Sequence, residues 1–182
     1  MKPKRSQSIA LVMMGASALA LSACDESQVD AMVYDSLQQC IEDPAMTPDQ
    51  CKANYAVAKA EHAKVAPKYT SRADCEADFG PEHCEQAPYR TQSGGSVFMP
   101  LMMGYMMGSM LSGRSGVAPQ PLYRAADDPR GYRTADNRKI GTGTGATKVA
   151  QSAARSPSVK TSTVRRGGFG ASARSYTRTG LG

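Results

Sequence analysis

The chain has 182 residues, 6% aromatic side chains and no Trp, and its second half is rich in Gly, Pro and Ser. So few large side chains exclude an extensive buried core. The net charge of +6 conceals an acidic stretch, 24–113 with 6 basic and 13 acidic residues, followed by a basic one, 114–182 with 13 basic and 3 acidic residues.

Residues 1–23 have the features of a bacterial signal peptide. Three basic residues among the first five positions precede the apolar run Ile9–Leu21, which has 13 residues. A membrane-spanning helix needs about 20 apolar residues, so this run fits the apolar core of a signal peptide instead. We therefore expect export from the cytoplasm and removal of residues 1–23.

The four residues that end at Cys24 read Leu-Ser-Ala-Cys and resemble the bacterial lipobox. In such signals the Cys thiol receives fatty acyl chains such as palmitate, and two or three chains anchor a protein stably. We expect a lipoprotein on the periplasmic face of the cell membrane; the alternative is an ordinary secretory signal that contains a Cys. Asp25 resembles the signal that retains lipoproteins in the inner membrane, which favours the inner over the outer membrane.

Residues 24–92 are predicted to form a small acidic helical domain. Apolar residues of Gln28–Ile41 recur near helical spacing, which predicts a first helix. Thr47-Pro48-Asp49-Gln50 resembles a capping box with Pro at the first helical position, and predicts a second helix that runs to about Val65. Ser71 can cap a short third helix that stops at Gly80-Pro81.

Four cysteines remain once Cys24 carries lipid: Cys40, Cys51, Cys75 and Cys84. An even number in an exported chain predicts two disulfides, whereas a zinc site would be expected to contain a C-x2-C pair that is absent. Three pairings are possible. The pattern Tyr-x-Ser-x3-Cys occurs twice, 35 residues apart, which suggests that each unit closes its own loop. This favours Cys40–Cys51 and Cys75–Cys84; the rival is a helical hairpin linked by disulfides between its two helices.

Residues 93–113 are rich in Met and Gly. Six methionines follow the spacing of one face of a helix: Met99, Met102, Met103, Met106, Met107 and Met110. Gly104 and Gly108 form a small-x3-small pair that would allow another helix to approach closely. We predict an apolar helix for contact with a partner or the membrane. Val97–Leu111 is short for a membrane span, and a Cu(I) site of thioethers is the remaining alternative.

Residues 114–182 lack periodic apolar residues and are predicted to be a largely disordered, flexible basic tail rich in Gly, Ser and Arg. Arg165-Arg166-Gly167-Gly168-Phe169-Gly170 looks like segments of some nucleic-acid-binding proteins, but the export signal argues against nucleic acid as a partner. Anionic lipid or an acidic cell-wall polymer is the more fitting partner, and a tail without a specific partner is the alternative.

No residue set indicates catalysis. His62 and His83 are the only histidines, and both lie in hydrophilic sequence where we expect them at the surface. No nucleophile, base and orienting group can be assigned, so we predict no catalytic residues, no cofactor and no metal ligands.

Several segments together resemble the YgiB-like family of bacterial proteins, a domain of unknown function. They are the lipobox at Cys24, CIED…CKANY, YTSRADCEADFG…C, GGSVFMPLMMGYMMG and RGGFGASAR, which cover nearly the whole mature chain. The resemblance implies no activity. Members are often encoded beside an ATP-grasp, glutathionylspermidine-synthase-like enzyme, which implies that the chain is an accessory or substrate of such an enzyme.

The sequence thus predicts a mainly α protein with a small disulfide-stapled helical head, a Met-rich apolar helix and a flexible tail. The leading functional interpretation is a non-enzymatic envelope lipoprotein that acts through membrane or partner contact. The alternatives are periplasmic Cu(I) handling by the Met-rich face and a role as accessory or substrate of a ligase-like enzyme.

Overall fold

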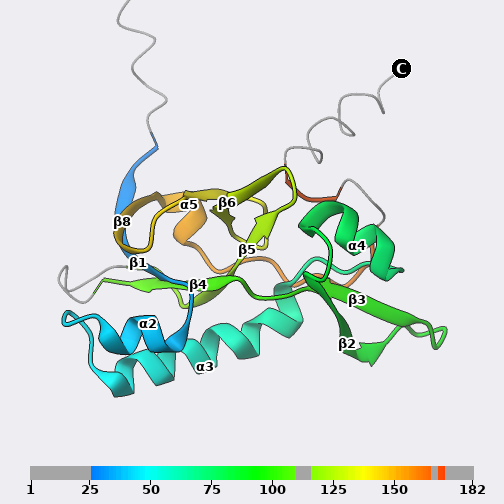
Figure 1. Ribbon diagram of the computed structural model, residues 1–182, viewed down its shortest axis with the longest axis horizontal. Coiled ribbons are helices and arrows are strands. Elements are labelled where there is room, and N and C mark those ends of the chain that lie inside the picture. Colours follow the sequence, from blue (N-terminus) through cyan, green and yellow to red (C-terminus); the bar gives the residue numbers. More distant parts are fainter. Residues whose placement is uncertain (1–25, 110–115, 165–167, 171–182) are drawn as a thin grey trace, which may run out of the picture.

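The computed structural model describes residues 26–109, 116–164 and 168–170. Four helices and eight strands lie in these ranges (Figure 1). In chain order they are β1 (Gln28–Tyr34), α2 (Leu37–Glu42), α3 (Pro48–Val65), α4 (Arg72–Phe79), β2 (Cys84–Arg90), β3 (Ser96–Pro100), β4 (Gly104–Gly108), β5 (Gln120–Ala125), β6 (Asp128–Arg133), β7 (Lys139–Gly141), β8 (Gly145–Ala150) and α5 (Gln151–Ala154).

Six strands form one antiparallel sheet in the order β7-β6-β5-β4-β1-β8, and β2 and β3 form a separate hairpin. Although β7 and β8 are the two edges of this sheet, only residues 142–144 connect them. Such a connection spans at most about 14 Å between Gly141 and Gly145, so the sheet must curl until its edges approach each other. The result is a small, nearly closed barrel.

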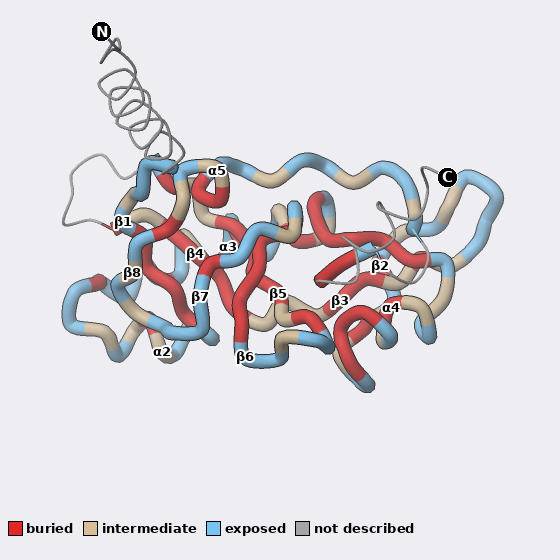
Figure 2. The backbone as a smooth tube through the Cα atoms, turned by 90° about the horizontal axis from the view of Figure 1, so that it is seen from above, coloured by how far each residue is buried: buried red, intermediate tan, exposed pale blue. Residues whose placement is uncertain are grey.

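Alternate residues of the central strands face opposite sides of the sheet. In β1, Ala31 and Val33 belong to the cluster inside the barrel, whereas Met32 and Tyr34 belong to the cluster that also contains residues of α2 and α3. Because helices cover its outer surface, β1 is buried on both sides over Ala31–Tyr34 (Figure 2). Such strands lose the apolar–polar alternation that normally reveals them in a sequence.

The predicted mainly α fold is wrong. The first expected helix is instead β1 followed by the short helix α2, and residues 116–164, expected in a disordered tail, form β5–β8 and α5. Strands β5 and β8 pair with β4 and β1, so this part of the supposed tail completes the central sheet. These strands are hard to recognise in the sequence, because they are short and because Pro121, Pro129 and Gly131 lie within them.

The prediction of a Met-rich helix in residues 93–113 is also wrong, because this segment forms the strands β3 and β4. Four of its six methionines form two doublets, 102–103 and 106–107, and two consecutive residues of a strand face opposite sides. Met106 accordingly lies inside the barrel, and Met107 packs beneath the helices. Gly104 allows β4 to approach β1, since a Cβ atom here would lie 2.7 Å from the Tyr34 carbonyl oxygen.

The other two predicted helices are confirmed. α3 begins with Pro48, is capped by reciprocal hydrogen bonds between Thr47 and Gln50, and ends at Val65. The Ser71 side chain caps α4, which ends at Phe79 before Gly80, whose φ of 98° favours glycine.

The structure contains the two favoured disulfides. Cys40–Cys51 joins α2 to α3, and Cys75–Cys84 joins α4 to β2. Each closes a short local loop, and such bonds typically stabilise a fold by about 2–4 kcal/mol.

A second core lies between β5, α4 and the β2–β3 hairpin, and it contains Phe169 from near the end of the chain. The Phe169 ring is 4.6 Å from that of Phe79 and 6.1 Å from that of Tyr123, measured between centroids. In Figure 1 the orange segment after α5 runs back across the molecule toward α4. The chain therefore returns to the body of the protein after its last helix.

Candidate functional site

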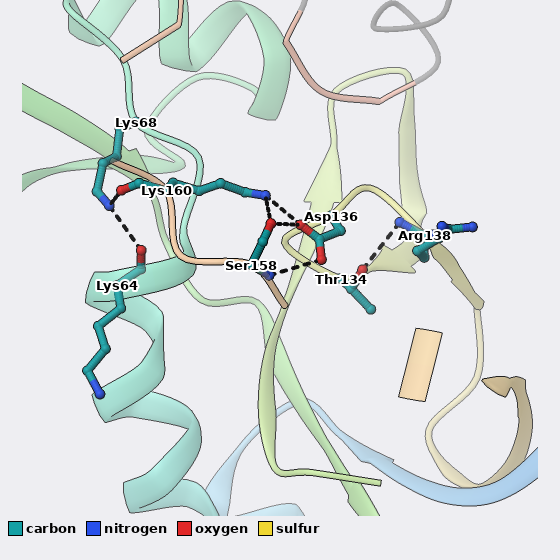
Figure 3. Close-up of polar contacts among 7 residues, drawn as sticks. All are labelled: Lys64, Lys68, Thr134, Asp136, Arg138, Ser158 and Lys160. Carbon is teal, nitrogen blue, oxygen red and sulfur yellow. Dashed lines mark hydrogen bonds and ion pairs between the residues drawn. The ribbon is translucent and has the colours of Figure 1, made fainter. Parts of the chain in front are cut away.

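A cleft of about 360 Å³ lies where three distant segments meet. Lys68 follows α3, Asp136 and Asn137 belong to the turn between β6 and β7, and Lys160 belongs to the extended segment after α5. Figure 3 shows how the polar side chains of these segments converge. The remaining lining residues are Pro67, Ala135, Ser162, Val164, Gly168 and Phe169.

The Lys68 ammonium is the buried charge of this cleft, since the residue is only 7% exposed. It donates hydrogen bonds to the carbonyl oxygens of Lys64, at 3.0 Å, and Lys160. No ion pair to Lys68 occurs within the described residues. Burial, together with the charge of Lys160, lowers the pKa of Lys68. The ammonium is therefore held by neutral acceptors and lacks a counter-charge from this part of the chain.

Asp136 is already paired. Its carboxylate accepts hydrogen bonds from the Lys160 Nζ at 2.5 Å, the Ser158 Oγ at 2.7 Å and the Ser158 backbone N–H at 3.1 Å. Burial alone would raise the pKa of Asp136, but these hydrogen bonds and the charge of Lys160 lower it overall. The charges of Asp136 and Lys160 cancel each other. The ammonium of Lys68 therefore gives the cleft one net positive charge.

A tight turn positions Asp136. The backbone N–H of Thr134 donates to the carbonyl oxygen of Arg138 at 3.0 Å, and Asn137 adopts a φ of 61°, which Asn tolerates well. The Asn137 side chain also exchanges hydrogen bonds with Gly170: its Nδ2 donates to the Gly170 carbonyl oxygen, and its Oδ1 accepts from the Gly170 N–H. One side chain thus joins the turn to the segment that carries Phe169.

His62 is buried, which corrects its expected surface position. Its Nδ1 lies 2.9 Å from the Tyr123 hydroxyl and its Nε2 lies 3.3 Å from a Glu85 carboxylate oxygen. Burial lowers the pKa of His62, with partial compensation by Glu85, and burial raises the pKa of Tyr123 well above its ordinary value. A neutral His beside a protonated phenol crosslinks α3, β2 and β5, and these three side chains include no hydroxyl or thiol activated as a nucleophile. His83 is half-buried, and its Nδ1 lies 2.8 Å from the Phe79 carbonyl oxygen.

The predicted Met face is divided among three separate clusters. Met99 packs with Phe79 in the second core, Met106 lies inside the barrel, and Met107 packs beside the Cys40–Cys51 disulfide. The half-buried Met102 and Met103 lie between β3 and β4. A single Cu(I) site on a helical Met face is therefore wrong. Within the described ranges, no group of three or more His, Cys, Asp or Glu could hold a metal.

The remaining predicted site residues, Cys24, Asp25 and Met110, lie outside the described residues. Of the helices that the structure describes, none has the length and apolar character needed to cross a membrane.

Sequence reasoning missed Lys68, Asp136 and Lys160. They are far apart in the chain, and only the return of the segment after α5 brings them together. A weak local signal exists, because Lys68 sits between Val65-Ala66-Pro67 and Tyr69, and an isolated Lys among apolar residues is a candidate for burial.

Comparison with known proteins points to one family. The family model described as "Protein of unknown function (DUF1190)" matches residues 28–180. Two similar relatives are the UPF0441 proteins of Erwinia tasmaniensis, 38% identical over 84% of this chain and 75% of the relative, and Serratia proteamaculans, 38% identical over 94% and 84%. A third, from Sodalis glossinidius, is 40% identical over 82% and 74%. No solved structure matches the chain. The expected resemblance to an uncharacterised bacterial family is confirmed.

Proposed function

Since the chain belongs to the DUF1190 family of unknown function, we propose its function from its own residues: a non-enzymatic, lipid-anchored envelope protein that acts by contact. The lipid is attached to Cys24 on the periplasmic face of the inner membrane, and the folded domain meets the membrane and a partner protein there. Two local disulfides support an exported protein, because disulfides persist mainly in oxidising compartments.

The observation that carries the proposal is the position of Glu26, only two residues after Cys24. The Glu26 carboxylate accepts a hydrogen bond from the Ser152 backbone N–H at 2.6 Å, and this contact lowers the pKa of Glu26. Gln151 donates its backbone N–H to the Ser27 carbonyl oxygen at 2.9 Å. Two residues of chain span about 7 Å, so an acylated Cys24 would hold this end of the domain directly at the lipid surface.

The membrane-facing end would then consist of the start of β1, the end of β8 and α5. Its exposed residues include Gln28, Gln151 and Arg155, which suit contact with lipid headgroups and not insertion into hydrocarbon. The β2–β3 hairpin lies at the opposite end of the molecule (Figure 1). An anchor at Cys24 therefore leaves the hairpin directed into the periplasm, where a partner protein can reach it.

Single-tryptophan variants test this orientation, since the chain contains no Trp. Gln151→Trp places the reporter at the proposed membrane end, and Gln92→Trp places it in the turn of the β2–β3 hairpin. The lipidated variants are reconstituted in vesicles that contain a lipid brominated close to the headgroup. We expect strong quenching of Trp emission for Gln151→Trp and little for Gln92→Trp.

The same pair in a Cys24→Ser chain that starts at residue 24 is the control, because this chain lacks both the acylated thiol and the apolar run Ile9–Leu21. Neither reporter should then be quenched when the protein is added to the same vesicles. Equal quenching of both reporters in the anchored protein, or of neither, would contradict the proposed orientation. Membrane attachment that survives Cys24→Ser would contradict the lipid anchor itself.

A further inference from the structure

We propose that the cleft between Lys68, Asp136 and Lys160 binds the C-terminal carboxylate of a peptide, with Lys68 supplying the charge that the carboxylate meets. This inference does not depend on the lipid anchor. It follows from the charge and the shape of the cleft, and from backbone groups at its rim that make no backbone hydrogen bond within the described residues.

The charge balance favours a single anionic group. A lysine ammonium has three N–H donors, and two of those of Lys68 are directed to carbonyl oxygens. The ammonium also lies 5.4 Å from the centroid of the Tyr89 ring, a neutral π face, so among the described residues no anion offsets its charge. Lys64, near the end of α3, pairs with Glu61 at 2.8 Å, and Lys160 pairs with Asp136 at 2.5 Å, so neither has an unmatched charge. A dianionic phosphate would meet one unmatched ammonium and the repulsion of Asp136, whereas a carboxylate needs only one counter-charge.

The volume of the cleft and the apolar part of its lining favour a ligand with a small apolar group beside the carboxylate. Its volume of about 360 Å³ lies at the lower end of the range for ligand pockets. Pro67, Val164 and the Phe169 ring provide the apolar part of the lining. The terminal residue of a peptide, with a side chain such as that of valine, combines these two features.

The rim provides a reason to prefer a peptide over a free acid. The extended segment after α5 is attached at both ends, since Lys160 donates its backbone N–H to the Lys64 carbonyl oxygen and Val164 donates to that of Lys68. Between them, Thr161, Ser162 and Thr163 make no backbone hydrogen bond within the described residues. An extended peptide can pair with such groups while its terminal carboxylate reaches Lys68.

Fluorescence anisotropy with two labelled peptides tests the proposal on the unmodified mature chain in detergent. Both peptides read Gly-Gly-Ser-Thr-Val; one has a free C-terminal carboxylate and the other a C-terminal amide. We expect the acid to bind at least about tenfold more tightly than the amide, which corresponds to about 1.4 kcal/mol. Equal affinities, or no binding of either peptide, would overturn the proposal.

Three variants locate the site. Lys68→Met keeps an apolar stem but removes the ammonium, and should reduce acid binding to the level of the amide. Lys64→Met, in the last turn of α3 four residues before Lys68, is the matched control and should leave acid binding unchanged. Asp136→Asn removes the competing negative charge and should strengthen acid binding. If a folded Lys68→Met protein binds the peptide acid as tightly as the unmodified chain does, the assignment of Lys68 is contradicted. If Lys68→Met does not fold, the comparison of the acid and amide peptides on the unmodified chain still decides the proposal.

Discussion

The carboxylate of Asp78 accepts a hydrogen bond from the backbone N–H of Gly168 at 2.9 Å, across 90 residues of sequence. The same oxygen accepts hydrogen bonds from the Tyr69 hydroxyl at 2.8 Å and from the Phe169 backbone N–H at 3.2 Å. Asp78 is buried, so these donors satisfy a charge that would otherwise be costly. This contact fixes the returning segment beside the Lys68 cleft and makes it part of the folded domain.

Phe169→Ala should therefore destabilise the whole domain. Phe169 is only 1% exposed, and removing a buried Phe side chain costs about 3 kcal/mol or more. Urea unfolding at neutral pH measures this loss. Val159→Ala, an exposed position of the same returning segment, should change the free energy of unfolding by less than about 0.5 kcal/mol. Equal, small effects of both changes would show that Phe169 does not belong to the core.

The buried His62 predicts a loss of stability in mild acid. Burial lowers the pKa of His62 in the folded protein below its ordinary value of 6.5. Below pH 6.5 His62 is therefore protonated in the unfolded chain but still largely neutral in the folded protein. The free energy of unfolding then decreases as the pH falls. The loss between pH 7.5 and 5.5 should reach at most about 1.4 kcal/mol, before carboxylates begin to titrate.

Urea unfolding at these two pH values measures that loss. His62→Gln should make the free energy of unfolding nearly independent of pH in this range, whereas His83→Gln should keep the native dependence. A native protein that becomes more stable on acidification would contradict the account of a neutral, buried His62.

Gly104→Ala should destabilise the sheet by about 1–3 kcal/mol, a typical cost of overpacking. The added Cβ would lie 2.7 Å from the Tyr34 backbone oxygen and 3.2 Å from the Tyr132 ring, so β1 and β4 must separate. Gly143→Ala is the matched control, because nothing lies within 4 Å of a Cβ at that position. Thermal unfolding compares the two variants. A Gly104→Ala protein as stable as Gly143→Ala would refute the close approach of these strands.

Local signals in the sequence identified the helix caps and the disulfides, but not the sheet. Thr47 and Ser71 make their capping bonds with residues three positions away, so neighbouring residues suffice to reveal them. The strand β1 pairs with β4 and β8, which are distant in sequence, and its two buried faces show no alternation. The doublet Met106-Met107 fits both the apolar face of a helix and a strand that is buried on both faces. Hydrophobic periodicity therefore could not distinguish a helix from a strand here.

The candidate site depends even more on long-range contacts. Lys68 and Lys160 are 92 residues apart in the sequence, and the residues that flank each of them form no known binding motif. Their meeting depends on the docking of the segment after α5, whose richness in Gly, Ser and Arg predicts a flexible tail. The composition predicts that this segment has too few apolar residues to form a core of its own. It does not reveal that Phe169 packs into a core that α3 and α4 also form.

The intact mass of the protein extracted from bacterial membranes under non-reducing conditions tests the central claim most directly. We expect a chain that begins at Cys24, carries the mass of fatty acyl chains, and lacks the hydrogens lost in forming Cys40–Cys51 and Cys75–Cys84. A chain with the mass of the unprocessed 182 residues, without acyl groups and with reduced thiols, would contradict the account.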